Sequence, residues 1–329
     1  MTALRSILLR REAGIAVMIV LFCLAVGTQK PQFLTLDSLR IILLLTPLIM
    51  IGAMGQMLVI VARHVDLSIG SMLGFSAMVT GMMFKFYPEI WWPVGFVVSI
   101  GIGGALGLLN GALVTVFRLP AIIVTLGTLN LYRGLTYIVS NAKQIDRQFV
   151  PSALKSLSQT SPMLGIPWII FISFGIAVLT WLFVMHTRVG RQIFALGSNP
   201  VAAPLRGVDV TKVTLLVFAI SGALSGLAGI LYASRWGFVN PSNTGSGFEF
   251  QVIAAVVIGG VSINGGVGTV LGTVLGVLLL GCVSAALPLL GIPGTTQSAI
   301  YGAVILIALL IDRTVRQQGV KSLSMRARA

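Results

Sequence analysis

The sequence predicts an all-α protein, a polytopic bundle of transmembrane helices. The chain has 329 residues, of which 56% are hydrophobic and only 9% are charged, and its mean hydropathy is +1.00. Soluble domains carry about 25% charged residues, so a soluble globular protein is excluded. The apolar runs repeatedly reach the roughly 20 residues that a helix needs to cross a bilayer, without the alternation of barrel strands. We expect one transmembrane domain over residues 1–329.

Ten apolar windows between polar breaks are the candidate spans. They cover residues 13–29, 40–62, 67–86, 92–117, 120–139, 166–186, 211–234, 250–262, 267–288 and 297–312. The window 250–262 is short for a complete crossing. An even number of spans puts the two tails, residues 1–12 and 313–329, on the same side of the membrane.

The loop formed by residues 186–212 is the longest clearly cationic break between two spans. It carries Arg188, Arg191, Arg206 and Lys212 against a single carboxylate, Asp209. Loops rich in Lys and Arg are retained on the cytoplasmic side of a membrane. With this orientation the cytoplasmic segments hold twice as many Lys and Arg residues as the outer segments. We therefore expect the loop and both tails to face the cytoplasm, and the loop to be a docking surface for another subunit.

Two stretches of the chain resemble each other. Residues 59–74 (VIVARHVDLSIGSMLG) align without gaps on residues 257–272 (VIGGVSINGGVGTVLG). In the expected topology the two copies run parallel, which is a pattern that transporters use to build a central path between two halves. A chance similarity in a chain so rich in Gly and Val is the alternative.

The 38 glycines recur at helical spacing in several predicted spans. Four-residue intervals separate Gly103, Gly107 and Gly111, Gly222 and Gly226, and Gly268, Gly272 and Gly276. Small residues at this spacing let helix backbones approach closely in lipid. We expect these glycines to pack helices against one another.

The chain lacks the residue patterns of several kinds of chemistry. No Gly-x-x-x-x-Gly-Lys motif occurs, so the usual phosphate-binding loop is absent. Cys23 and Cys282 have no spacing typical of metal ligands, and no disulfide is expected. All eight acidic residues fall at span ends or in loops, which argues against a proton or sodium relay and against paired catalytic carboxylates. We predict no catalytic residue and no metal site.

Neutral polar residues dominate inside the predicted spans. They are Asn110, Thr125, Thr128 and Asn130, and Arg133 lies further along the same span as the last three. Such groups suit a translocation path for an uncharged polar solute such as a sugar. Each Thr has the alternative of bonding to the carbonyl of the preceding helical turn. Arg133 has the alternative of extending to the outer surface of the membrane.

Asp66 precedes the predicted span 67–86. We expect its carboxylate to pair with Arg63 or to cap the helix that follows.

Four stretches of the chain together resemble one family. They are residues 65–74 (VDLSIGSMLG), 119–134 (LPAIIVTLGTLNLYRG), 190–208 (GRQIFALGSNPVAAPLRGV) and 253–276 (IAAVVIGGVSINGGVGTVLGTVLG). In order and spacing they are similar to the membrane subunits of sugar-importing ATP-binding-cassette transporters of the ribose and autoinducer-2 type. The match covers most of the chain between residues 60 and 310.

This resemblance implies the partners of the chain. A member of the family pairs with a second permease copy or a close relative, binds two cytoplasmic ATPase domains, and receives its solute from a periplasmic or extracellular binding protein. ATP is then handled by the partner subunits, and this chain carries no cofactor. By the same likeness, the segment that contacts the ATPase contains Gly197, Asn199, Ala202, Ala203 and Gly207.

The hypothesis from sequence is a permease subunit in the bacterial inner membrane that imports a small neutral sugar by alternating access. Net charge of +14 is explained by membrane orientation, so no nucleic-acid partner is expected. One alternative is a permease for another small solute, such as branched-chain amino acids. The other is an ion-coupled carrier that works without partners.

Overall fold

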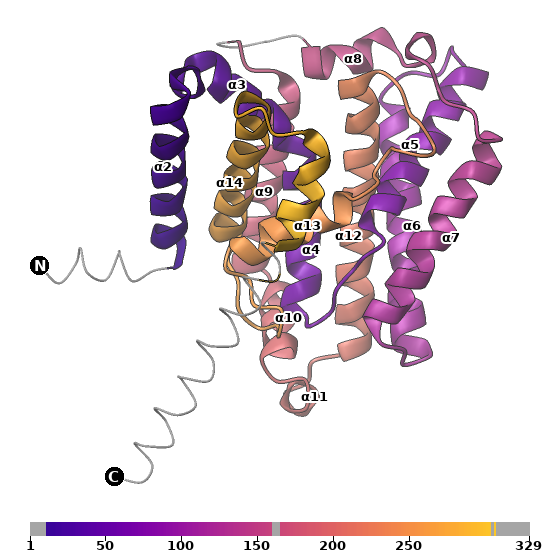
Figure 1. Ribbon diagram of the computed structural model, residues 1–329. Helices are drawn as coiled ribbons and strands as arrows, with labels where there is room; N and C mark the ends of the chain where they lie inside the picture. The colour runs from indigo at the N-terminus through magenta and orange to yellow at the C-terminus, as the bar shows by residue number, and fades with distance from the viewer. Residues whose placement is uncertain (1–10, 160–164, 304–305, 307–329) are drawn as a thin grey trace, which may run out of the picture.

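The computed structural model describes residues 11–159, 165–303 and 306, and throughout these residues the chain is built from helices and connecting segments (Figure 1). Its one isolated β-bridge in this part joins Ile145 and Val239. The helices are α2 (Arg11–Gln29), η1 (Pro31–Leu34), α3 (Leu36–Leu45), α4 (Pro47–Val61), α5 (Ile69–Phe86), α6 (Val94–Val116), α7 (Ala121–Ser140), η2 (Arg147–Phe149), α8 (Ser152–Gln159), α9 (Trp168–His186), α10 (Arg188–Ser198), α11 (Ala202–Leu205), α12 (Val210–Trp236), α13 (Phe248–Ile258), α14 (Val270–Leu289) and η3 (Gly294–Thr296). The predicted all-α bundle is confirmed.

Seven helices, α2, α5, α6, α7, α9, α12 and α14, are long and apolar enough to cross a membrane. The bent pair α3 and α4 raises this number to eight. The ten spans expected from the sequence are therefore not confirmed. The window 250–262 corresponds to α13, which has 11 residues, and half of the window 297–312 lies outside the described residues, as do residues 1–10 and 313–329 of the two tails.

The predicted span 40–62 is broken between α3 and α4. The two helices meet at an angle of 44°, with Thr46 between them. Pro47 is the first residue of α4, where its missing N–H costs nothing because the first helical turn has no internal acceptor for it. Thr46 Oγ1 donates to the carbonyl of Leu43, which satisfies a polar group at the bend.

Helix α4 lies in the core, and all of its 15 residues are buried. Helix α12 packs beside it and against α6 through the predicted glycine positions. A Cβ atom on Gly107 would collide with the carbonyl oxygen of Phe218, and one on Gly222 would collide with that of Gly103. The two backbones touch here, as the four-residue glycine spacing predicted.

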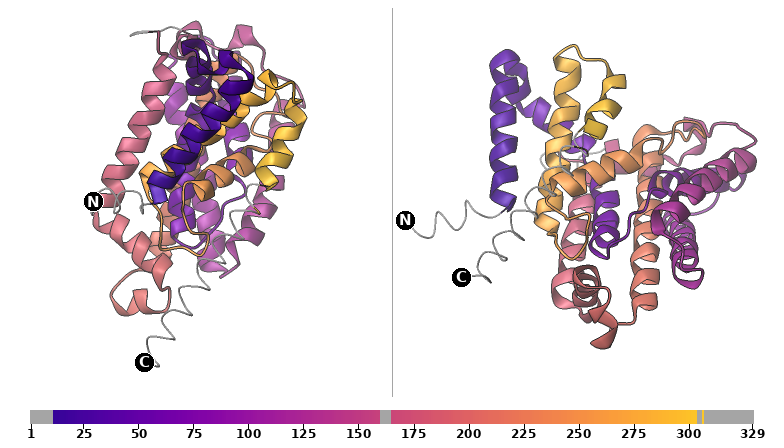
Figure 2. Two further views of the ribbon diagram at one scale, coloured as in Figure 1. Left: turned by 60° about the vertical axis from the view of Figure 1, so that its left-hand side comes forward. Right: turned by 60° about the horizontal axis from the view of Figure 1, so that its bottom comes forward.

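Helix α13 lies across the bundle, steeply inclined to α12 (Figure 2). Its 11 residues follow a segment, residues 237–247, that enters the interior, where Thr244 is only 1% exposed. An irregular segment at such depth is tolerated in membrane proteins where protein covers it. A helix of 11 residues is too short to cross the membrane, and its inclination reduces its reach further.

The two similar stretches have the same order of elements. In each, a helix ends (α4 or α13), an irregular segment follows, and the next helix begins (α5 or α14). We call the irregular segment between the two helices of each copy its break. The two breaks touch, because Gly266 N–H donates to the carbonyl of Val61, the last residue of α4, at 2.9 Å. The similarity therefore corresponds to a repeated helix–break–helix unit whose copies meet at one end of the bundle.

Helix α2 stands at the edge of the bundle and packs against α14 (Figure 1). Both cysteines are free thiols in the structure, but their sulfur atoms, one on each helix, are only 3.9 Å apart.

We predict that oxidation with copper phenanthroline joins Cys23 and Cys282 within one chain, because a small approach brings the sulfurs to bonding distance. These are the only two cysteines in the sequence, so maleimide labelling of the denatured protein should fall from two thiols to none. The Cys23→Ser variant should keep one labelled thiol. Retention of both thiols in the oxidised protein would contradict the packing of α2 on α14.

Candidate functional site

The segment 186–212 forms two short helices at one end of the bundle, α10 and α11 (Figure 1). Thr187 begins α10, since its Oγ1 accepts from Gly190 N–H at 2.9 Å. Asp209 begins α12 by accepting from Lys212 N–H at 3.0 Å, and this backbone hydrogen bond lowers the pKa of its exposed carboxyl. Caps on both sides fix where α10 and α12 start.

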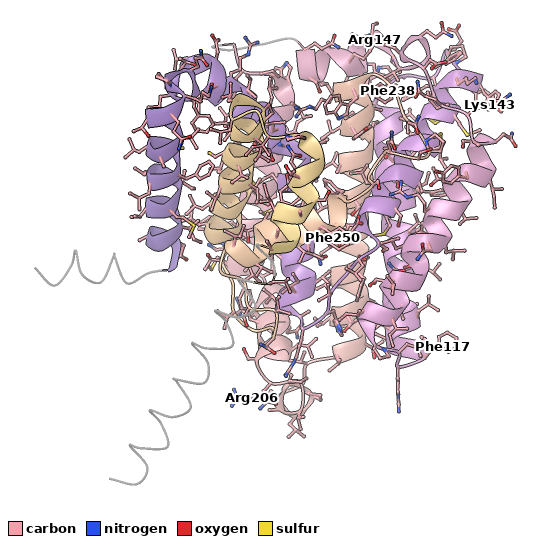
Figure 3. All side chains as sticks on the ribbon, viewed as in Figure 1. Phe117, Lys143, Arg147, Arg206, Phe238 and Phe250 are labelled. Atoms are coloured by element: carbon pink, nitrogen blue, oxygen red, sulfur yellow. The ribbon has the colours of Figure 1, made fainter. Side chains whose placement is uncertain are left out.

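The tip of this segment exposes apolar side chains. Val201 and Leu205 are 80% and 87% exposed, and Arg206 follows directly at the same end of the molecule (Figure 3). Apolar side chains that stand free of the bundle beside a cationic residue are typical of a protein-docking surface. We call Val201, Leu205 and Arg206 the tip.

The family resemblance places five residues at the ATPase contact. In the structure their main role is to hold the backbone that carries the tip. Asn199 Oδ1 accepts from the N–H groups of Val201 and Ala202, which fixes the start of α11. Ala203 is buried, and Gly207 follows α11 with a positive φ of 78°. Gly197 is buried as well.

Gly197 faces the bundle. A Cβ atom on it would collide with the carbonyl oxygen of Val61, the same oxygen that accepts from Gly266 N–H. Ser198, the next residue, packs on Gly266. The end of α10 thus rests on both breaks of the repeated unit, which links the tip to the core.

A buried polar cluster lies at the break between α4 and α5. Asp66 Oδ1 accepts from both Ser68 N–H, at 2.9 Å, and Ser68 Oγ, at 2.7 Å. Ser68 Oγ accepts from Asn110 Nδ2 at 2.8 Å, and Tyr132 OH is 3.0 Å from Asn110 Oδ1. All four side chains are 0% exposed. The cluster joins the start of α5 to α6 and α7, and burial raises the pKa of the Asp66 carboxyl.

Sequence reasoning identified only Asn110 of this cluster. It placed Asp66 outside the bundle as a partner of Arg63 or as a cap. Arg63 is exposed, and Asp66 instead bonds to the residue before α5, so the capping alternative is nearer to the structure. Burial was missed because the hydropathy windows put residues 63–66 at the membrane surface.

The predicted path residues do not gather on one surface. Asn110 is in the cluster, and Thr125 and Thr128 are buried. Thr125 Oγ1 donates to Ala121 O at 2.9 Å, and Thr128 Oγ1 lies 3.4 Å from Thr125 O, so both bond to the preceding turn of α7. Of the neutral residues, only Asn130 is exposed, and its Nδ2 donates to Leu126 O.

Arg133 is half-buried, and its side chain reaches the segment 237–247. Its Nη1 donates to the carbonyl of Thr244 at 2.6 Å and holds the segment 237–247 against α7. Glu249, only 7% exposed, attracts the guanidinium electrostatically. Between them lies the face of α5 that carries Gly70 and Gly74, where a Cβ atom would meet Glu249 Oε2 or Thr244 O. The structure therefore joins α5, α7 and α13 around two opposite charges.

The chain matches a family model described as "Branched-chain amino acid transport system / permease component" over residues 38–309. It is 34% identical over 316 residues to an autoinducer 2 import system permease protein of Photorhabdus luminescens, covering 94% of this chain and 92% of the relative. It is also 34% identical over 305 residues to the ribose import permease protein of Escherichia coli (strain K12), with 92% and 94% covered. No solved structure is a significant match.

We predict that Tyr132→Phe destabilises the protein by about 1–3 kcal/mol, because buried acceptors lose their hydroxyl partner. Tyr132 OH lies 3.0 Å from both Asn110 Oδ1 and Leu106 O. Thermal unfolding in detergent should show a lower melting temperature. The control is Tyr137→Phe on the same helix, where the side chain is 37% exposed. Equal melting temperatures for the two variants would contradict a structural role of the cluster.

Proposed function

The chain belongs to the family of permease components of branched-chain amino acid transport systems, and from this membership we propose that it is the membrane subunit of an ATP-binding-cassette importer. The proposed solute is a small neutral sugar or sugar-like molecule. The printed names of its relatives, which are import permeases for ribose and autoinducer 2, support this class of solute. The protein is a multi-pass membrane protein, and we place it in the bacterial inner membrane.

The exposed tip is the observation that carries this proposal. A solitary carrier has no need to display Leu205 and Val201 in water, because each apolar side chain gains free energy by burial against a partner. Two cytoplasmic ATPase domains, one for each of two permease copies, would bind the tips and move them. Gly197 and Val61 would pass that movement to the helix ends behind α10.

The remaining partners follow from the same arrangement. Both termini are cytoplasmic in this proposal, on the side of the tip, which agrees with the distribution of Lys and Arg in the sequence. The opposite end, where Figure 3 shows Lys143, Arg147 and Phe238, would receive the periplasmic binding protein. ATP binds only the partner subunits. Nucleic acid has no part in the proposed function.

The translocation path would run along the face of α7 that this chain leaves uncovered. Asn130 is exposed there, and a polar side chain on such a helix face is expected to meet water or a partner more readily than lipid. A second permease copy facing this side would enclose the path. Asn110, Thr125 and Thr128 then act behind the path and position α7, while Arg133 fixes its outer half to residues 237–247.

Import of a branched-chain amino acid is the second candidate. The opposite charges of Arg133 and Glu249 would complement a zwitterion. Arg133 already donates to Thr244 O, however, so binding a carboxylate would compete with an existing hydrogen bond. We therefore favour the neutral solute.

The test is reconstitution into liposomes. The permease with its ATPase and binding protein, taken from the neighbouring reading frames, should take up labelled ribose or autoinducer 2 only with ATP, and the permease alone should be inert. Uptake of leucine instead would favour the second candidate. Accumulation by the isolated chain on a proton or sodium gradient would overturn the proposal in favour of an ion-coupled carrier.

We predict that Leu205→Asp lowers ATP-dependent uptake by about tenfold, because a charge replaces an apolar contact at the centre of the docking surface. Membrane insertion should be unchanged, since Leu205 is 87% exposed and supports nothing in the bundle. The control Leu205→Met keeps an apolar side chain and should retain uptake. Pull-down of the ATPase by the two variants measures the contact directly. Normal binding by Leu205→Asp would exclude the tip as the docking surface.

A further inference from the structure

Arg63 follows the core helix α4 in a backbone conformation that favours glycine. Its φ is 72°, its N–H donates to the carbonyl of Ile60 at 2.8 Å, and His64 N–H donates to that of Val59 at 3.0 Å. These two bonds form a Schellman motif, whose left-handed residue is usually Gly because a Cβ atom is unfavourable there. An Arg at this position costs free energy that Gly would avoid, so its side chain calls for an explanation.

Arg63 lies at the base of the tip. A Cβ atom on Gly265 would meet the Cβ atom of Arg63 at 2.9 Å and the carbonyl oxygen of Gly197 at 3.1 Å. Arg63 is therefore placed where the two breaks meet the end of α10, and its side chain is exposed there (Figure 1). Helix α10 ends at Ser198, and the tip begins shortly after it at Val201. A partner that covers the tip thus comes close to Arg63.

Within the described residues, Arg63 has no ion pair with a carboxylate of its own chain. Each described acid near this end of the bundle is already held by another residue. The pairs are Glu12 with Thr269 at 3.0 Å, Asp66 with Ser68 at 2.7 Å, and Asp209 with Lys212 at 3.1 Å. The exposed guanidinium of Arg63 is therefore available to an acid from outside the chain.

The surface around Arg63 has the charge that attracts an acidic protein. Six exposed cations lie in the segments at this end, and the exposed acid described there is Asp209. The cations are Arg63, Arg118, Arg188, Arg191, Arg206 and Lys212. Helix α4 is buried along its whole length among other helices, so Arg63 stands inside the ring of helices rather than at its lipid-facing rim. This position favours a carboxylate of a docked protein over a lipid headgroup.

We propose that Arg63 is a second contact between this chain and the partner ATPase, and that its guanidinium binds an acidic side chain of that subunit. Arg suits this role because it binds a carboxylate through two parallel hydrogen bonds. The tip acts on α10 and α12, whereas Arg63 acts on α4 itself, so the ATPase holds the core helix as well as the surface segment. This inference rests on the proposed function, because it assumes that an ATPase docks on the tip.

The test measures the affinity of the purified ATPase for the full-length permease in phosphatidylcholine nanodiscs. Arg63→Gly keeps the Schellman motif and removes only the side chain, so the melting temperature should not fall. The affinity should fall about tenfold, as expected for the loss of one charge pair from an interface. Arg63→Lys should bind better than Arg63→Gly, and Arg63→Glu should bind worse, because the sign of the charge decides the contact.

Arg118→Gly is the matched control. Arg118 is also exposed and also has a positive φ, 54°, so the substitution makes the same change in backbone freedom and in net charge. Figure 3 shows its neighbour Phe117 at the same end of the bundle but well apart from Arg206 of the tip. We expect Arg118→Gly to bind the ATPase as the original chain does.

Three results would overturn the inference. Equal affinities for Arg63→Gly and Arg118→Gly would show that the position of the charge does not matter. A lower melting temperature of Arg63→Gly would show that the side chain serves the fold. A loss of affinity that occurs only in nanodiscs containing phosphatidylglycerol would assign Arg63 to lipid headgroups. Failure of the ATPase to bind the unaltered permease would instead refute the proposed function.

Discussion

The hydrogen bonds that Asp66 accepts from Ser68 make the rest of the bundle possible. Residues 62–68 leave helical geometry beside buried helices, and Asp66 and Ser68 are fully buried there, away from water. The carboxylate supplies an acceptor for both the N–H and the hydroxyl of Ser68, and Ser68 passes the interaction to Asn110. A carboxyl group at this position is costly to bury, and the bonds offset that cost. Three helices are positioned as a result.

Close backbone contacts at glycine residues also hold helices together, both in the core and at the surface of the protein. Without a hydrophobic drive between helices in lipid, close backbone packing holds α6 to α12 at Gly107 and Gly222. The same device recurs outside the bundle core, where Gly197 rests on the carbonyl of Val61. A side chain at Gly197 would separate α10 from the breaks behind it. The tip is consequently attached to the interior by backbone contacts, which deform less than long side chains do.

Sequence periodicity was sufficient for the features that depend on one helix and insufficient for those that depend on several. Glycine spacing predicted close packing at these glycines but not which helices meet. The threonines of α7 bond to their own preceding turns, which was one of the two alternatives. The inclination of α13 and the burial of Asp66 could not be read in this way. Hydropathy averages over a window along the chain, whereas Asp66 is covered by α12, more than 140 residues away. The hydrogen bond of Arg133 to Thr244 could not be predicted for the same reason, since Thr244 belongs to a distant segment of the chain.

Most polar side chains expected to line the path are already hydrogen-bonded within the protein, and this bears on which subunit would select the solute. Asn110, Thr125 and Thr128 are bonded within the protein, and Arg133 holds Thr244, so most of the polar side chains expected to contact solute are already engaged. In the proposed importer, a path with few free hydrogen-bonding groups would bind a sugar weakly, which would favour its release after each cycle. Discrimination among solutes would then fall to the proposed binding protein, because a site that pairs every hydroxyl of its ligand rejects analogues far more strongly than a sparsely polar passage. The membrane subunit is free to use its buried polar groups for positioning helices.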